Sequence, residues 1–405
     1  MNTVRRTFRS AYYVAPRPRS IAREGCRAVL VWRDSSGNRE LDDAAVPVAA
    51  VSFIEASGRS RVPKRRARTH SSSITSHDIA RMTGVSQSTV SRALRGDPHV
   101  AAATRERVLQ AARELRYVPS DIGRSLSTRL TRRIGMVVTD VANPFYPYLV
   151  GPLHDVLDEL GYRMVLFAER GEAGALADRL AGQSIDGVVL TTAMLESELA
   201  RDLHARGLPF VFLNRVAEGV PGDVVTVDNA LGASLVGHEV VRRGHTDVAA
   251  IFGPLETSTG RDRERGFRVA LASAGVQLPE AAVRHGDYHY DTGYEGMLSI
   301  MSGTGMRPTA VFCGNDAIAI GALNAARKAG VAVPDEVSII GFDDIPIADW
   351  ELIQLTTVHT PASEMAASAG RLLVERIEAR PRVLEPRIRI YEPHLVMRRT
   401  LADVS

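Results

Sequence analysis

The chain of 405 residues is poor in cysteine and has no long apolar segment. Its two cysteines, Cys26 and Cys313, lie in dissimilar sequence contexts, which argues against a disulfide framework or a thiolate metal site. No stretch approaches the ~18 apolar residues of a membrane-spanning helix, and residues 1–30 lack the apolar core of a secretory signal. We therefore expect a cytoplasmic, nucleoid-associated protein without a membrane segment, a metal or a cofactor.

The sequence also lacks the short motifs that mark common catalytic sites. It contains no GxSxG nucleophile elbow, no phosphate loop ending in GK[ST], no HExxH and no CxxC. Scattered aspartates and histidines can be fitted to almost any mechanism and carry little weight. We therefore expect no enzymatic activity.

Charge is distributed very unevenly along the chain. The formal net charge is +3, but residues 61–133 carry 16 Arg and Lys against 5 Asp and Glu, a net of +11. Residues 1–60 carry +4, which leaves −12 on the rest of the chain from residue 134. A basic module joined to an acidic body is typical of a polyanion-binding head on a self-repelling carrier.

The most informative segment is 74–95, ITSHDIARMTGVSQSTVSRALR. It predicts a helix from about Ser76, as N-cap, to Met82, then a turn at Gly84 and a second helix capped by Ser86. Apolar residues should face inward, namely Ile79, Ala80, Met82, Val90, Ala93 and Leu94. Hydrogen-bonding side chains should face outward, namely Gln87, Ser88, Ser91 and Arg92. This is the pattern of a DNA-reading helix-turn-helix, although an ordinary polar-faced hairpin is the alternative.

A third predicted helix, residues 104–115, completes a small helical unit. One stripe of this helix is apolar, consisting of Val108, Leu109, Ala112 and Leu115. The tripeptide Tyr-Val-Pro at 117–119 then ends the helix. The predicted DNA-binding domain therefore spans residues 74–118, about the smallest size that can bury a core.

Three tracts closely resemble the lactose-repressor (LacI) family. They are V-S-x-S-T-V-S-R-A-L at 85–94, R-Y-V-P-S-D-I-G-R-S-L at 116–126 and I-G-M-V-V-T-D-V-A-N-P-F-Y at 134–146. A further tract from Gly253 to Phe267 also resembles the family's. The resemblance covers Ile74 to about Leu401. It implies a helix-turn-helix head, a hinge helix and linker at 119–133, and a two-lobed body at 134–405 that binds an effector and dimerises.

The resemblance implies that the head and the hinge bind double-stranded operator DNA. The implied DNA-binding residues are Ser76, Ser86, Gln87, Ser88, Thr89, Ser91, Arg92, Arg95, Arg124 and Leu126. In the family the hinge folds when two copies meet on DNA, and a leucine from each, here Leu126, wedges into the minor groove. Gly123 replaces the family's usual alanine and weakens this helix by about 1 kcal/mol. The alternative is that Leu126 is a linker residue that contacts the body.

Residues 1–73 lie outside the resemblance and allow three interpretations. They are rich in arginine, and lysine occurs in the whole chain only at positions 64 and 328. They can form a disordered basic arm that adds nonspecific phosphate affinity. An organelle transit peptide is disfavoured by their acidic residues. A misassigned start, with translation beginning nearer Val62, is the third interpretation and our hypothesis.

From residue 134 onward, apolar strands alternate with amphipathic helices. The predicted strands are 134–141, 162–169, 186–191, 209–214, 224–228, 247–253, 309–314 and 337–344. This alternation predicts α/β lobes built on doubly wound parallel sheets, as in periplasmic binding proteins, with helices on both faces. Ligands bind such folds beside the carboxyl ends of the strands, so the polar residues that follow the strands are the site candidates.

The resemblance implies an effector site between the lobes. Arg263 would clamp hydroxyls or a carboxylate, and Asp316 would accept from vicinal hydroxyls, although it can also cap the next helix. Aromatic candidates are Phe145, Tyr146 and Tyr288. Asn214 and Thr191 are further candidates, with a merely loop-stabilising role as the alternative.

Two departures from the family pattern stand out. Pro147 and Pro152 fall in the first predicted helix of the body, which predicts a kink or restart within an element that contributes to the family's dimer interface. Thr257 stands where purine-binding members have an arginine, which favours a sugar over a purine. The chain ends soon after its final predicted strand without an added heptad tail, which favours a dimer over a tetramer.

The sequence thus predicts a homodimeric transcriptional repressor that a small molecule, a sugar by preference, releases from a pseudo-palindromic operator. Two alternatives stay open. One is a regulator that needs a corepressor, and the other is a sugar-binding receptor without DNA-reading function. The effector's identity, the operator and the target genes are not encoded in any recognisable motif.

Overall fold

The computed structural model describes residues 31–33, 39–41, 74–94, 96–117, 130–139, 143–168, 173–182, 184–303 and 307–404. The chain divides into two units, residues 1–72 and residues 73–405. In the first unit, β1 (Val31–Arg33) and β2 (Arg39–Leu41) form an antiparallel pair. The predictions for Arg95, Arg124, Leu126, most of the hinge and the rest of the first 73 residues lie outside the described residues.

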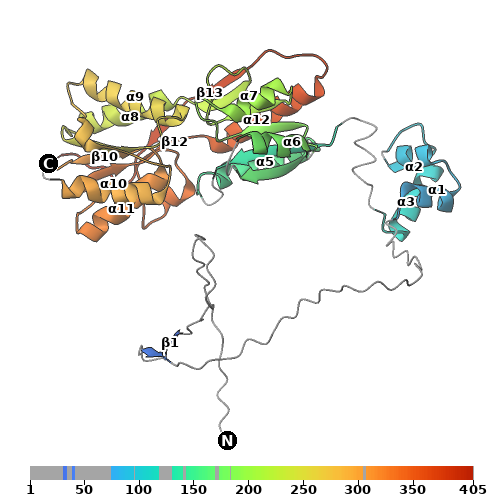
Figure 1. Cartoon of the computed structure of the whole chain (residues 1–405), viewed down its shortest axis with the longest axis horizontal. Coiled ribbons are helices and arrows are strands. Elements are labelled where there is room, and N and C mark those ends of the chain that lie inside the picture. Colours follow the sequence, from blue (N-terminus) through green and yellow to red (C-terminus); the bar gives the residue numbers. More distant parts are fainter. Residues whose placement is uncertain are drawn as a thin grey trace, which may run out of the picture. The chain divides into compact units, whose positions relative to one another are not determined.

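The head consists of three helices (Figure 1), and its element bounds are α1 (Ser76–Thr83), α2 (Gln87–Leu94) and α3 (Ala102–Glu114). The predicted cap at Ser76 is wrong by one residue, because the Asp78 carboxylate accepts hydrogen bonds from both Thr75 N and Thr75 Oγ1. The predicted cap at Ser86 is confirmed, since Thr89 N donates to Ser86 Oγ at 3.2 Å.

Most of the predicted inward-facing residues of the head form its core. The buried residues are Ile79, Val90, Ala93, Val100, Val108, Ala111 and Ala112. Met82 was expected to face inward but is 53% exposed. Its neighbour Thr83 is buried instead, and the Thr83 hydroxyl is satisfied by donating to Ile79 O.

The first lobe of the body, here called the N-lobe, contains a six-stranded parallel sheet in the order β13-β7-β6-β5-β3-β4. Its strands are β3 (Arg133–Val138), β4 (Arg163–Ala168), β5 (Gly187–Leu190), β6 (Phe210–Leu213), β7 (Asp223–Val227) and β13 (Ile388–Tyr391). Its helices are α5 (Pro147–Glu159), α6 (Ala173–Gly182), α7 (Glu198–Ala205) and α12 (Ala362–Glu378). Alternate strand residues face opposite sides: Met136 packs with α5 and α12, and Val137 with α6 and α7.

The second lobe, the C-lobe, contains a four-stranded parallel sheet in the order β11-β10-β8-β9. Its strands are β8 (Val248–Phe252), β9 (Val283–His285), β10 (Ala310–Cys313) and β11 (Ser338–Ile340). Helices α8 (Asn229–Arg242) and α9 (Ser258–Ser273) cover one face. Helices α10 (Tyr290–Ser302) and α11 (Asp316–Ala329) cover the other. Two short 3-10 turns complete the lobe, η1 (Glu280–Ala282) and η2 (Pro346–Asp349).

The chain crosses between the lobes after β7, before α12 and after β13. β12 (Thr357–His359) and β14 (His394–Val396) flank two of these crossings and pair antiparallel. All eight predicted strands are confirmed, while β9, β12, β13 and β14 were not predicted. α5 begins at Pro147 and runs through Pro152 as one helix, so the predicted restart is absent. Because parallel strands of both sheets end toward the space between the lobes, the polar residues after them converge there.

Candidate DNA-reading surface and interlobe cleft

The start of α2 presents a polar surface built from hydroxyl, amide and guanidinium groups. Ser86, Gln87, Ser88 and Arg92 are exposed, whereas Thr89 and Ser91 are half-buried. Gln87 Nε2 donates to Ser76 Oγ at 3.3 Å, so the beginnings of α1 and α2 form one continuous edge. These side chains can hydrogen-bond to base edges and phosphates, the two kinds of contact that DNA readers make.

A small polar cleft lies between the two lobes of the body. Its lining residues are Asn143, Phe145, Tyr146, Asn214, Arg215, Thr259, Arg263, Tyr288, Asn315 and Asp343. Five of them were proposed from the sequence, namely Phe145, Tyr146, Asn214, Arg263 and Tyr288. The cleft encloses about 20 Å³, which is room for about one water molecule. A sugar-sized ligand therefore does not fit inside the cleft in this arrangement.

Arg263, on α9, is the best-fixed side chain of the cleft. It is 2% exposed, and its guanidinium lies 3.7 Å from the centroid of the Phe342 ring. Its Nε, Nη1 and Nη2 donate to Asn229 Oδ1, Gly314 O and Asp343 Oδ1 at 2.8, 2.7 and 3.0 Å. Three of the five N–H donors of an arginine are thus engaged, which leaves two for a ligand.

Asp343 follows β11 and forms a buried ion pair with Arg263. Burial raises the pKa of Asp343 to about 6, although Arg263 and Arg215 act in the opposite direction. The carboxylate is therefore ionised at neutral pH. Its Oδ1 accepts from Arg263, and its Oδ2 is available as a second acceptor.

Asp316 lies outside the lining of the cleft, although the sequence proposed it as a ligand-binding residue. Thr357 Oγ1 donates to Asp316 Oδ1 at 2.5 Å, and Ile345 N donates to Oδ2 at 2.8 Å. The side chain is fully buried, and burial and then the charge of Asp343 raise its pKa well above the ordinary value. Asp316 thus ties α11 to the segments after β11 and at β12, and Asn315 before it reaches the cleft instead. Asn315, not Asp316, caps α11.

Thr191 also lies outside the lining residues. It is 1% exposed, and its hydroxyl donates to Val137 O at 2.6 Å. This geometry corresponds to the loop-stabilising alternative.

Tyr288 forms one aromatic wall of the cleft. Its hydroxyl donates to Thr259 Oγ1 at 3.1 Å, and its ring packs directly on the backbone of Gly253. A Cβ at position 253 would lie 2.2 Å from Tyr288 Cζ, so only glycine allows this approach. On the other wall, Tyr146 OH hydrogen-bonds with Thr139 Oγ1 at 2.8 Å.

Five lining residues were not predicted from the sequence, namely Asn143, Arg215, Thr259, Asn315 and Asp343. Each lies next to a feature that was recognised: a strand end, the NPFY motif, or the tract from Gly253 to Phe267. For Arg215, Asn315 and Asp343 the signal was their position within three residues of a strand end. The sequence does not indicate which of two adjacent residues, such as Asn315 and Asp316, faces the cleft.

Hydrogen bonds join the lobes on both sides of the cleft. Asn143 Nδ2 donates to Tyr288 O at 2.8 Å, and Val216 N donates to Ser258 Oγ at 3.0 Å. An exposed ion pair between Arg261 and Glu218 adds a further contact. These contacts must break if the lobes separate, so cleft access and lobe arrangement are coupled.

Thr257, one of the two departures from the family pattern, lies at the start of α9. Thr257 is fully buried, donates to Pro254 O at 2.7 Å and accepts from Gly260 N at 3.0 Å as the N-cap of α9. It therefore supports the helix and does not line the cleft.

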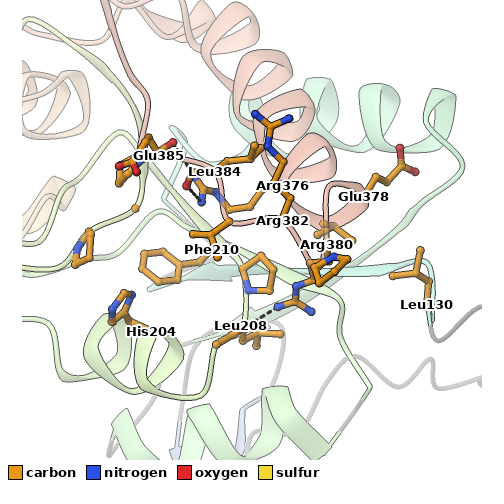
Figure 2. A pocket seen from close by; sticks show the side chains of 18 residues that line it. Leu130, His204, Leu208, Phe210, Arg376, Glu378, Arg380, Arg382, Leu384 and Glu385 are labelled. Carbon is orange, nitrogen blue, oxygen red and sulfur yellow. Dashed lines mark hydrogen bonds between the residues drawn. The ribbon is translucent and has the colours of Figure 1, made fainter.

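A second, larger groove of about 990 Å³ lies on the N-lobe, at the end of the sheet where β6 and β7 begin (Figure 2). Arg376, Arg380 and Arg382 come from the end of α12 and the loop after it. Arg376 is anchored behind the groove by Asp223, which is fully buried and also pairs with Arg387. This network holds the loop before β13 against the sheet.

Within the described part of the chain, no helix is long and apolar enough to cross a membrane. The same residues contain no cluster of three or more His, Cys, Asp or Glu side chains that could hold a metal ion.

A small helix-turn-helix head and a two-lobed body with an interlobe cleft define the class of ligand-responsive DNA-binding regulators. The chain matches the model "Bacterial regulatory proteins, lacI family" over residues 75–120 and a periplasmic binding protein-like domain over residues 238–401.

Known proteins match over nearly their full length. The ribose operon repressor of Escherichia coli K12 is 33% identical over 321 residues, covering 78% of this chain and 96% of that protein. A PurR repressor of Erwinia tasmaniensis is 35% identical over 332 residues, covering 80% and 96%. The solved lac repressor dimer bound to operator and the anti-inducer ONPF matches with 26% identity and a TM-score of 0.73, covering 81% and 99%. The chain belongs to the LacI family of DNA-binding transcriptional regulators.

Proposed function

We propose that this protein is a repressor that binds a two-fold-symmetric operator as a homodimer and is released by a small polyhydroxylated effector in the interlobe cleft. The observation that carries the proposal is the pairing of an exposed polar α2 surface with a closed polar cleft in one chain. The solved relative bound to operator is a dimer, which supports the same assembly here. Because the operator is the proposed target, the cytoplasm is the proposed location.

The composition of the cleft supports a sugar-like effector. Amide, guanidinium and carboxylate groups lie beside the aromatic walls Tyr146 and Tyr288. Such groups bind hydroxyls by hydrogen bonds and sugar faces by packing. Among relatives, both a ribose operon repressor and a purine repressor match, and the buried Thr257 favours the sugar side.

The size of the cleft supports a switch driven by the effector. Because the cleft holds about one water molecule, binding of a sugar requires the bridging contacts at Asn143 and Val216 to change. An effector that binds only the separated lobes shifts the population toward that arrangement, and operator affinity changes with it. In a corepressor-dependent response, the same coupling would make effector binding raise the operator affinity instead of lowering it.

Regulation without catalysis is part of the proposal. The matching proteins are repressors. In the cleft, the Thr259 hydroxyl hydrogen-bonds with the hydroxyls of Tyr288 and Thr257, neither of which is a strong base. Incubation with a panel of sugars should therefore leave every sugar chemically unchanged.

The test is selection of bound duplexes from a random pool by the full-length protein at ~150 mM salt, where nonspecific phosphate binding is weakened. We expect a two-fold-symmetric site, and an Arg92→Ala protein should recover it poorly. Addition of the cognate effector should then release the wild-type protein from this site. Recovery of no motif by folded, dimeric protein would refute the proposal and favour a sugar receptor without DNA-reading function.

A further inference from the structure

The charges of the described side chains that line the cleft do not sum to zero. Three charged side chains line it: Arg215, Arg263 and Asp343. Arg263 and Asp343 form a buried ion pair at 3.0 Å, so their charges cancel. Within the described part of the chain, the Arg215 guanidinium has neither a hydrogen bond nor an ion pair. It lies 5.2 Å from the centroid of the Tyr288 ring, and its charge also lowers the pKa of Asp343.

Three acidic residues close to Arg215 in the sequence or near the cleft have other hydrogen-bond or ion-pair partners. Asp344 accepts from Arg398 and hydrogen-bonds with His359, both at distances below 3 Å. Asp316 accepts from Thr357 and from the backbone of Ile345. Glu218 pairs with Arg261. The charged residues described in the lining therefore sum to a net charge of +1, and Arg215, which is half-buried, is the cation among them without an ion-pair partner in the described part of the chain.

The residue before Arg215 provides an independent observation. Asn214 is 9% exposed and lines the cleft, and its Oδ1 is a buried acceptor that no donor among the described residues reaches. Leaving a buried acceptor unpaired is destabilising. Asn214 also has a φ of 72°, in the left-handed region that asparagine adopts more readily than most non-glycine residues.

Resting on the function proposed above, we propose that the effector is a polyhydroxylated carboxylate, that is, a sugar acid. Its carboxylate pairs with Arg215, whose fork of donors matches a carboxylate in a bidentate geometry. One of its hydroxyls donates to Asn214 Oδ1. A single negative charge matches the single uncompensated positive charge of the cleft, which makes a carboxylate a better match than a doubly charged phosphate ester.

The test compares matched acids and neutral sugars by calorimetric titration of the full-length protein. Pairs are glucuronate with glucose, galacturonate with galactose, and gluconate with sorbitol, and glucose 6-phosphate tests the phosphate source. We expect one acid to bind at least tenfold more tightly than its neutral partner. Arg215→Gln should abolish this preference, whereas Arg215→Lys should retain part of it.

A minimal probe makes the test independent of sugar stereochemistry. Glycolate at high millimolar concentration should raise the melting temperature of the wild-type protein above that in chloride of equal ionic strength. The Arg215→Gln protein should show no such difference. Tighter binding of neutral sugars or of the phosphate, or a glycolate effect that does not depend on Arg215, would overturn the proposal.

Asn214 has its own expected result. Asn214→Leu removes the unpaired acceptor and should weaken the acid and its neutral partner by a similar factor, at least fivefold. Unchanged affinity for both would contradict its assignment. Operator selection separates the two proposals: a protein that binds a symmetric operator but responds only to neutral sugars keeps the proposed function and loses the sugar acid.

Discussion

Replacing Asp223 with asparagine is expected to destabilise the N-lobe by about 3 kcal/mol. Asp223, at the start of β7, is fully buried. Its two oxygens accept from Arg376 Nε and Nη2, from Arg387 Nε and Nη2, and from Arg387 N, at distances of 2.7 to 3.3 Å. An asparagine keeps the shape but loses the charge, and its NH2 group faces arginine donors.

The magnitude follows from burial. Removal of one partner of a buried ion pair costs about 3–5 kcal/mol. The side chains of Arg376 and Arg387 are 17% and 33% exposed, so water can partly solvate them after the substitution and the lower end applies. For a domain of this size, about 3 kcal/mol corresponds to a fall of roughly 6–12 °C in the melting temperature.

The assay is calorimetric or circular-dichroism melting of the full-length protein, with Asp178→Asn as the matched control. Asp178 pairs with Arg206 at 2.7 Å, but these side chains are 73% and 40% exposed. The control should therefore change stability by no more than about 0.5 kcal/mol. If Asp223→Asn is no more destabilising than Asp178→Asn, the network does not hold the loop before β13 as argued.

The pH dependence provides a second readout. Burial alone would raise the pKa of Asp223, but hydrogen bonds from Arg376 and Arg387 more than offset it and hold the pKa below the ordinary value. A lowered pKa in the folded state stabilises the protein above the unfolded-state pKa of about 4, and this contribution is lost as the pH falls further. The difference between wild type and Asp223→Asn should therefore narrow below pH ~4.

Three further outcomes are expected. Gly253→Ala should displace the Tyr288 ring, whose Cζ would lie 2.2 Å from the new Cβ, and should weaken effector binding at least tenfold in titration calorimetry while operator binding without effector persists. Gln87→Ala or Arg92→Ala should lower discrimination against mismatched operators by about 1–3 kcal/mol in competition binding; equal loss on all sequences would instead indicate a phosphate contact. Burial lowers the pKa of His245, so its contribution to stability should be complete above pH ~6.5 and decline below it, and His245→Gln should flatten this part of a melting-temperature profile.

Much of the fold could be predicted from local sequence pattern. Eight strands were recognised because fully buried parallel strands, such as Val188 to Leu190, are continuous apolar runs. β13 escaped prediction because it is an edge strand whose Ile388 and Ile390 are 68% and 63% exposed and alternate with arginine. Its place beside β7 is determined by pairing across more than 160 residues of sequence, which no local pattern encodes.

The sequence by itself determined the helix-turn-helix head, the α/β body and the strand ends where ligand-binding residues had to lie. Only the tertiary structure decided which residue at each strand end faces the cleft. Asp316 turns inward because donors from Thr357 and Ile345 meet it there, while Asn315 beside it lines the cleft. The tertiary structure also decides the role of Arg215. Among the described residues it has no ion-pair partner, because Asp343 pairs with Arg263 instead. Hydrogen-bond and ion-pair partners from distant segments determine which side chains face the cleft, and no local sequence pattern indicates these partners.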